Sequence, residues 1–297
     1  MQNRIVSFLI ILSIFYSSKS RSQAFTNSLC HDKNHSDLKI LENIYIEKQN
    51  STFGLSYSSY HTFIPEFIYG ISSNLNIGIQ LRLRTVYRSD TYEPSKIFQF
   101  KNSFTSSNYY QRYGLSGMEF IIRYPVKWFN YNFTMQHQIG IPLGKDLEGS
   151  AKKGYIDWNH FIIHNQIMTT FNLNKFQIYS EVGLRVENLS LDILDPFSSK
   201  NNYFCYLGFP ISILPVYSLH PQHHIYCLFQ INPRIAFSSD SKNYYDPYYQ
   251  LGFGYKFFFS KSYEIELITT RFITNDKNKT AYTFNLGIRK YWGRSIY

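Results

Sequence analysis

A two-residue alternation between positions 130 and 141 constrains the fold of this chain more than any other feature. Apolar or aromatic side chains occupy every second position, with one histidine among them, and small or polar side chains lie between: Tyr131, Phe133, Met135, His137, Ile139 and Ile141 alternate with Asn130, Asn132, Thr134, Gln136, Gln138 and Gly140. Successive side chains of a β-strand point to opposite faces, so this segment has one apolar and one polar face along most of a bilayer-crossing length. A closed barrel with lipid outside and a polar lumen inside suits both faces.

Composition also favours strands over helices as the membrane-crossing elements. Mean hydropathy is only −0.29, while aromatic residues reach 19%, with 27 Tyr and 26 Phe. A helical membrane protein needs apolar runs of about 18 or more residues, and the sequence has none. The sequence therefore predicts an all-β, antiparallel transmembrane barrel.

The N-terminus resembles a Sec signal peptide. Arg4 precedes a short apolar run over 5–16, and the small residues Ser22 and Ala24 predict cleavage after position 24. The alternative is a lipoprotein anchored at Cys30, although the residues before that cysteine lack the usual small-residue pattern. Cleavage lowers the formal net charge from +10 by three. The remaining basic residues are dispersed through strands, which argues against nucleic acid as a partner.

The alternation recurs along the rest of the chain and predicts about twelve strands. We expect 1–24 to be the signal peptide, 25–50 a periplasmic leader or lumen plug, and 51–297 the barrel. The expected strands cover, approximately, 51–60, 63–71, 75–84, 113–124, 130–142, 155–171, 176–187, 203–215, 224–237, 249–257, 263–267 and 282–289.

Loop lengths support an outer-membrane location. Connections after every second expected strand are short or moderate, whereas those at 89–112, 143–154, 189–202 and 238–246 are longer. Outer-membrane barrels have short periplasmic turns and longer external loops. The aromatic C-terminus at Tyr297 is similar to the signal that the barrel-assembly machinery recognises, and outer-membrane lipid and lipopolysaccharide are the expected surroundings.

The inward parity of the expected strands carries many charged side chains. We predict that the lumen is lined by Arg82, Arg84, Glu119, Arg123, Glu181, Arg185, Glu187, Arg234, Lys256, Glu264, Glu266 and Arg289. In a wet lumen such charges select polar or anionic solutes. Alternatively, they pair across neighbouring strands and fill a narrow barrel.

Other polar residues do not form a convincing catalytic or metal site. An outer-membrane lipase needs a Ser-His pair on the lipid face, and no such signature accompanies His137. His160 and His164 lie about 13 Å apart on a strand, too far for one zinc ion. We therefore expect no enzyme, cofactor or metal. The segment 25–50 contains residue types that can bind a metal, but their spacing matches no recognised site: Cys30, His31, Asp32, His35 and Asp37. Cys205 and Cys227 form either a disulfide or two apolar-facing thiols.

Several short motifs give the mature chain a family resemblance. They cover 65–71, 75–79, 141–144 and 284–288, reading PEFIYGI, LNIGI, IPLG and FNLGI. The chain resembles the outer-membrane transporter-like barrels that include the phenol-degradation meta-pathway group. That resemblance implies uptake or efflux of small molecules, but it transfers no substrate and no catalytic residue.

The expected function is passive passage of a small polar, anionic or aromatic solute through the barrel. A different class is a structural or surface-interaction barrel, in which the aromatic-rich loop at 89–112 contacts lipopolysaccharide or another protein. An outer-membrane enzyme is the third alternative.

Overall fold

The computed structural model describes residues 30–51, 54–106, 109–128, 131–144, 146–149, 153–189, 204–238, 244–245, 247–274 and 279–293. The expected signal peptide and residues 25–29 lie outside these ranges. Strands and one short 3₁₀ helix make up the regular structure: β1 Ser36–Ser51, β2 Gly54–Ser72, β3 Leu75–Ser89, η1 Pro94–Phe98, β4 Ser103–Ser106, β5 Tyr109–Trp128, β6 Tyr131–Pro142, β7 Phe161–Leu173, β8 Phe176–Leu189, β9 Phe204–Gly208, β10 Ile211–His220, β11 His223–Asn232, β12 Arg234–Ser238, β13 Tyr244–Tyr245, β14 Tyr248–Ser260, β15 Tyr263–Thr274 and β16 Lys279–Trp292.

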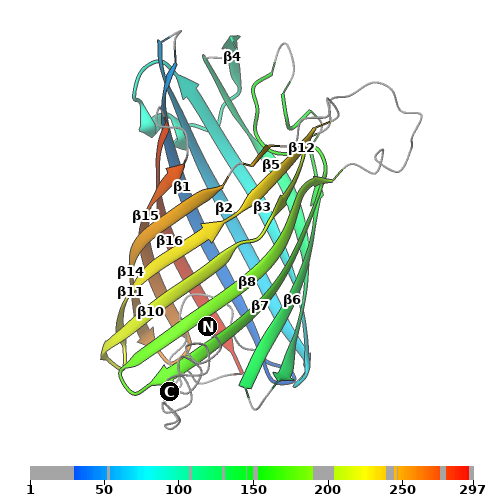
Figure 1. Cartoon of the computed structure of the whole chain (residues 1–297), viewed down its shortest axis with the longest axis vertical. Helices are drawn as coiled ribbons and strands as arrows, with labels where there is room; N and C mark the ends of the chain where they lie inside the picture. Colours follow the sequence, from blue (N-terminus) through cyan, green and yellow to red (C-terminus); the bar gives the residue numbers. More distant parts are fainter. Residues whose placement is uncertain are drawn as a thin grey trace, which may run out of the picture.

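These strands close into one antiparallel barrel of 12 strands (Figure 1). Closure runs through β1, which pairs with both β16 and β2, and through β8, which pairs with both β7 and β10. Three of the twelve barrel strands are interrupted, so that each consists of two segments: β9 and β10, β11 and β12, and β13 and β14. Proline has no N–H for the ladder, and Pro210 and Pro233 lie at two of these interruptions. Their carbonyls still accept hydrogen bonds from Gly183 at 2.8 Å and Phe209 at 2.9 Å, so the wall stays connected.

The predicted barrel and its strand number are confirmed, but two expected boundaries are wrong. Residues 36–50, expected in the leader, form most of β1, and β2 is one strand of 19 residues rather than two. One strand was missed and one was counted twice, so the expected number of strands is unchanged. Leu41 on the inner parity and Glu42 on the outer parity interrupt the alternation of β1, which hid it. The second error arose because His61 and Thr62 look like a turn between two short strands.

Burial separates the two faces of the wall. Outward side chains such as Ile77, Phe120 and Phe284 are 43%, 46% and 51% exposed, whereas the inward Asn76 and Arg123 are 0% and 1% exposed. The outward rows form the apolar belt that lipid covers. The inner face therefore carries most of the buried polar and charged side chains.

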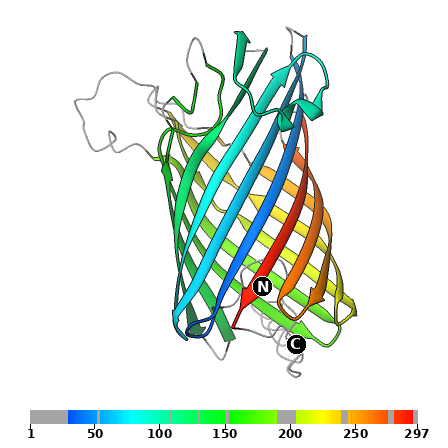
Figure 2. The same cartoon turned by 180° about the vertical axis from the view of Figure 1, so that it is seen from behind.

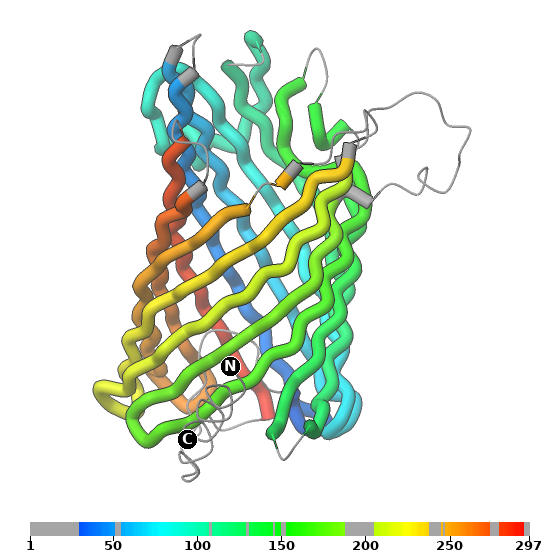
Figure 3. The backbone as a smooth tube through the Cα atoms, viewed as in Figure 1, coloured from blue at the N-terminus to red at the C-terminus, as the bar shows by residue number. Residues whose placement is uncertain are grey.

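The two ends of the barrel differ in their connections (Figures 2 and 3). One end, called the short-turn end, holds the tight turns after β2, β7 and β14, and Ser36 and Trp292 pair there. The other, the long-loop end, carries η1, β4 and the described residues that follow β6, and β8 ends there. This alternation agrees with the predicted loop asymmetry. Among the described residues, no helix is long and apolar enough to span a bilayer.

Candidate functional site

The lumen near the short-turn end is filled by a balanced set of charges, called the lower network. Lys39 Nζ lies 3.0 Å from Glu66 Oε1, and Arg289 Nη1 lies 3.4 Å from Glu264 Oε1. Register explains these pairs, because Lys39 is opposite Glu66 and Glu264 is opposite Arg289 in the ladder. The network contains four basic and four acidic side chains: Asp37, Lys39, Glu66, Arg123, Lys256, Glu264, Glu266 and Arg289.

Solvent barely reaches the lower network. The side chain of Lys256 is 1% exposed, and its Nζ lies 3.9 Å from Glu264 and 3.8 Å from Glu266. Tyr291 donates its hydroxyl proton to Glu264 at 2.9 Å, and Tyr226 donates to Glu266. Buried charges persist when they are paired and hydrogen-bonded. The lower network therefore acts as a packed floor rather than as the wall of a water-filled pore.

Residues 30–35 lie against the lower network at the short-turn end and are called the N-terminal hook. The backbone N–H of His31 donates to Asn76 Oδ1 at 2.6 Å, and Asn76 Nδ2 donates back to the His31 carbonyl at 2.9 Å. His31 Nε2 also lies 2.9 Å from Asp37 Oδ2. Close approach needs a glycine, because a Cβ on Gly70 would lie 2.2 Å from the Asp32 carbonyl oxygen. Burial raises the pKa of the Cys30 thiol to about 11.

An apolar cluster fills the lumen beside the floor. Its members lie on the inward parity of β7, β8, β10, β11 and β15. Glu181 lies on the same wall, where it accepts hydrogen bonds from Tyr179 at 3.0 Å and Ser212 at 3.3 Å. This half of the lumen thus resembles a protein core. The apolar cluster consists of Met168, Tyr179, Leu214, Val216, Tyr226 and Ile268.

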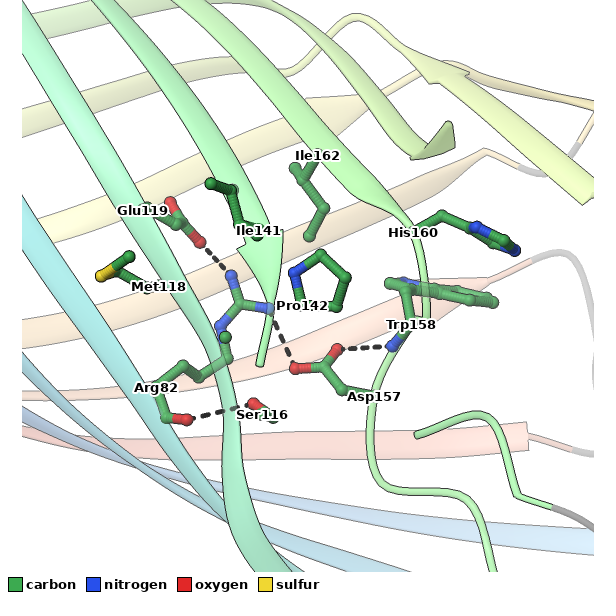
Figure 4. Close-up of a pocket in the computed structure, with 12 residues that line it drawn as sticks. Arg82, Ser116, Met118, Glu119, Ile141, Pro142, Asp157, Trp158, His160 and Ile162 are labelled. Carbon is green, nitrogen blue, oxygen red and sulfur yellow. Dashed lines mark hydrogen bonds and ion pairs between the residues drawn. The ribbon is translucent and has the colours of Figure 1, made fainter. Parts of the chain in front are cut away.

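A different arrangement occupies the lumen toward the long-loop end, where the described residues of the connection between β6 and β7 (143–144, 146–149 and 153–160) fold inward. Asp157 on this connection reaches two arginines of β3: its Oδ2 lies 3.1 Å from Arg82 Nη1, and its Oδ1 lies 3.1 Å from Arg84 Nη1. Arg82 also pairs with Glu119 of β5. Figure 4 shows the Arg82 guanidinium between the two carboxylates. We call the contact of Asp157 with this arginine pair the loop latch.

The described residues of the connection that carries Asp157 are called the latch loop. Apolar contacts and backbone hydrogen bonds hold this loop in place. Ile156 and Leu147 are 1% and 3% exposed and pack with Val86 and Tyr110 of the wall. Ile156 donates its N–H to the Leu147 carbonyl at 2.8 Å. Burial alone would raise the pKa of Asp157, but the guanidinium groups of Arg84 and Arg82 outweigh it and hold that pKa below its ordinary value. Asp157 is therefore an anion at neutral pH.

Beside the latch, β8 and β12 contribute a second arginine group. Arg185 Nε lies 2.8 Å from Glu187, and Arg234 Nη1 lies 3.6 Å from the same carboxylate. Arg234 also stacks 4.5 Å above the ring of Tyr206. The side chains of Arg185, Arg234 and Arg84 are 34%, 23% and 21% exposed. The seven residues of this upper cluster carry four positive and three negative charges: Arg82, Arg84, Glu119, Asp157, Arg185, Glu187 and Arg234.

The structure divides the twelve side chains that were expected to line the lumen into two groups and one isolated member. The first group lies in the upper cluster: Arg82, Arg84, Glu119, Arg185, Glu187 and Arg234. The second lies in the lower network: Arg123, Lys256, Glu264, Glu266 and Arg289. Glu181 belongs to neither group.

Sequence reasoning missed Asp157, which it placed in a strand over 155–171. Residues 155–160 belong instead to the latch loop, and loops have no periodicity that marks an inward side chain. Sequence reasoning also left Asp37 and Lys39 out of the lumen, because it assigned them to the leader.

The expected histidine positions are now explained by local pairing. His137 faces outward, as predicted, and its Nδ1 lies 2.6 Å from Asn165 Oδ1 while its Nε2 lies 2.9 Å from the Tyr124 hydroxyl. This pairing accounts for Asn165 on the otherwise apolar face of β7, since polar groups in lipid must find partners. His164 instead faces inward and its Nδ1 lies 3.2 Å from Gln138 Oε1, while His160 lies at the latch pocket.

The cysteine alternative is also resolved for the described residues, in which Cys30, Cys205 and Cys227 are free thiols. Cys205 pairs in register with Phe237, and Cys227 with Phe253, so the two are not opposite one another. Of the two alternatives for Cys205 and Cys227, the disulfide is therefore wrong. Within the described ranges, no group of three or more His, Cys, Asp or Glu side chains has the geometry of a metal site.

Solved outer-membrane barrels share this fold. An outer-membrane channel from Pseudomonas putida F1 aligns over 91% of this chain and 100% of its own length, with a TM-score of 0.61 and 10% identity. The beta domain of the Bordetella autotransporter BrkA aligns over 88% and 100%, with a TM-score of 0.54 and 13% identity. The translocator domain of the Neisseria meningitidis autotransporter NalP aligns over 88% and 90%, with a TM-score of 0.52 and 8% identity.

No protein-family model matches the sequence, and the curated proteins contain no match. The likeness to solved structures therefore defines the class of fold, an outer-membrane β-barrel, and the residues of this chain must supply the rest of the argument.

Proposed function

We propose that this protein is a gated outer-membrane channel that admits small anionic solutes from the long-loop side. The observation that carries the proposal is the difference in access between its lumen charges. Three arginines of the upper cluster keep 21–34% of their side chains exposed, whereas Lys256 and Glu264 in the lower network keep only 1% and 3%. A solute entering from the long-loop end meets accessible positive charge first, and a charged ring in a wet lumen selects ions.

The packed floor makes the resting channel closed. Passage requires rearrangement of side chains that are paired by charge, and water and a solute can replace such pairs more readily than they replace covalent or backbone links. The Pseudomonas putida channel supports this proposal because its fold covers nearly the same length of chain. The family resemblance of the sequence to small-molecule transporters points the same way.

Planar-bilayer recording tests the proposal. We expect rare, small openings with a reversal potential that shows preference for chloride over potassium. Arg185→Gln and Arg234→Gln, made singly, each leave Glu187 one arginine partner; each should keep the barrel and weaken that preference, because both arginines are partly exposed. A folded wild-type barrel without current and without solute uptake into liposomes would refute the channel.

The sealed floor itself favours a second candidate, a surface-binding barrel without passage. Its exposed outer aromatic residues include Tyr92, Phe98, Phe100 and Tyr109, which are 55%, 51%, 66% and 41% exposed. Deleting 90–102 distinguishes the candidates, because a channel keeps its current while a surface-binding barrel loses attachment to lipopolysaccharide. Both candidates are binding proteins, so purified protein is expected to release no fatty acid from phospholipid vesicles.

A further inference from the structure

The arginine pair at the latch is built to hold a carboxylate. The Arg82 and Arg84 guanidinium groups each contact a different oxygen of Asp157 at 3.1 Å. Arginine binds carboxylates well because its donors are planar and permanently charged. Asp157 itself is 3% exposed, so the site encloses its occupant.

The barrel wall holds both arginines from behind, while Arg84 Nη1 also donates to the Ile156 carbonyl of the latch loop at 3.1 Å. Glu119 of β5 holds Arg82, and Ser116 of β5 donates its hydroxyl to the Arg82 carbonyl at 3.1 Å. Thr62 of β2 accepts a hydrogen bond from Arg84 Nε at 3.2 Å. A site that is held by rigid elements stays organised when its occupant leaves.

The space beside Arg82 is too small for a solute carboxylate while Asp157 is in place. The cavity lined by Arg82, Glu119, Asp157, Trp158 and His160 has a volume of about 10 Å³ (Figure 4). That volume is about enough for one water molecule. An anion that contacts Arg82 must therefore take the place of the Asp157 carboxylate.

We propose that the Arg82–Arg84 pair is a binding site for small carboxylates, that Asp157 fills this site in the resting barrel, and that a solute carboxylate displaces Asp157 and releases the latch loop. The proposal rests on the proposed function, since it names the class of anion that the channel accepts. The loop thus carries a built-in competitor for the solute. Displacement involves no covalent step, only exchange of one carboxylate for another at the same guanidinium groups.

Trp158 provides a direct report of the exchange. Its backbone N–H donates to Asp157 Oδ1 at 3.0 Å, and its ring packs 5.6 Å from Tyr206 and 5.8 Å from Tyr155. The chain has only three tryptophans. Replacing the exposed Trp128 and Trp292 by Phe leaves Trp158 as the single fluorophore, and heat-modifiability on gels shows that this background is folded.

Sodium acetate is the probe, with sodium chloride at the same concentration as the control. We expect acetate to change the Trp158 emission in a saturable way, and chloride to cause no more than a small non-saturating change. Asp157→Asn removes the competing charge at nearly constant volume, so acetate should bind at least tenfold more tightly and the acetate-free emission should already be shifted. Arg84→Gln should abolish the acetate response.

Asp146→Asn is the matched control on the same loop. The Asp146 side chain is 55% exposed and pairs with Lys153 at 3.1 Å, away from the arginine pair. It should leave the acetate response unchanged. Equal responses to acetate and chloride in the unmodified site would overturn the proposal even if Asp157→Asn failed to fold.

These experiments test the carboxylate site and the channel separately. The Trp158 titration uses detergent-solubilised barrel and needs no passage of solute. A conducting barrel whose Trp158 ignores acetate refutes the carboxylate site alone, whereas a barrel that binds acetate without current refutes the channel and keeps the site.

Discussion

The two halves of the lumen both contain paired charges, but they differ in charge balance and in access to solvent. The lower network matches four basic with four acidic side chains and excludes water, while the upper cluster keeps an extra positive charge and leaves three arginines partly exposed. Charge lining a barrel is therefore not sufficient to define a pore. Access decides which charges serve structure and which can meet a solute.

The largest expected difference between the halves is in stability. Lys256→Ala leaves Glu264 and Glu266 buried without their ammonium partner, a change that costs about 3–5 kcal/mol. Arg185→Ala removes a partly exposed charge and costs about 0–1 kcal/mol. The measurement is the denaturant midpoint of the folded band in detergent, with the same gel shift reporting both variants. Equal midpoints would show that the floor is not packed as described.

The N-terminal hook offers a second test of close packing at the short-turn end of the lumen. A Cβ on Gly70 would meet the Asp32 carbonyl oxygen at 2.2 Å, a distance that backbone atoms do not tolerate. Gly70→Ala should therefore push the hook out of the short-turn end and destabilise the barrel by about 1–3 kcal/mol. The test is the alkylation rate of Cys30 in a background with Cys205 and Cys227 replaced by Ser. A rate equal to that of the Gly70 parent would refute the close approach.

The latch should persist well into acid. The pKa of Asp157 lies below its ordinary value of 3.8, because Arg84 and Arg82 stabilise the carboxylate despite its burial. A depressed pKa contributes stability that is complete above the unfolded value and is lost as pH falls through the folded value. Trp158 emission should therefore stay constant from pH 7 down to about pH 4 and change only below 3.8. A transition centred above pH 4 would contradict the paired carboxylate.

The effect with the least influence on the comparison of the two halves concerns Cys30 at the hook. Burial raises its pKa to about 11, although the charge of Arg123 opposes this. The thiolate is the reactive form, so iodoacetamide should modify Cys30 slowly at pH 7 and about tenfold faster for each pH unit up to about 10. Rates in the same cysteine background, measured by mass spectrometry, check this, and a plateau reached near pH 8 would contradict the buried thiol.

Periodicity was enough to predict the wall of the barrel, because burial alternates with side-chain parity along much of the wall, as at the start of β3. It placed Arg123 and Lys256 on the inner face and Ile77 and Phe284 on the outer. It could not reveal that Arg123 and Lys256 lie in a floor while Arg84 does not, since depth in the lumen depends on how far neighbouring strands are staggered. β1 was missed for a related reason: Glu42 on its lipid-facing parity broke the alternation.

The latch was beyond sequence reasoning for a different reason. Asp157 lies on a connection whose backbone has no regular repeat, and its partners on β3 are more than 70 positions earlier in the chain. Only the closed barrel brings them together. Conversely, Asn165 appeared to weaken the prediction of its strand, and the structure shows that His137 on the next strand supplies its partner.

The division of the lumen can be measured by the access of a water-soluble thiol reagent to two inward glutamines. Gln177 is 0% exposed near the short-turn end, and Gln250 lies on β14 toward the long-loop end with intermediate exposure. In a background with the three native cysteines replaced by Ser, a sulfonate thiol reagent should modify Gln250→Cys rapidly and Gln177→Cys at least a hundredfold more slowly in detergent. Equal rates would mean that one continuous water-filled pore crosses the barrel, and would contradict a sealed lower lumen below an accessible, cationic upper one.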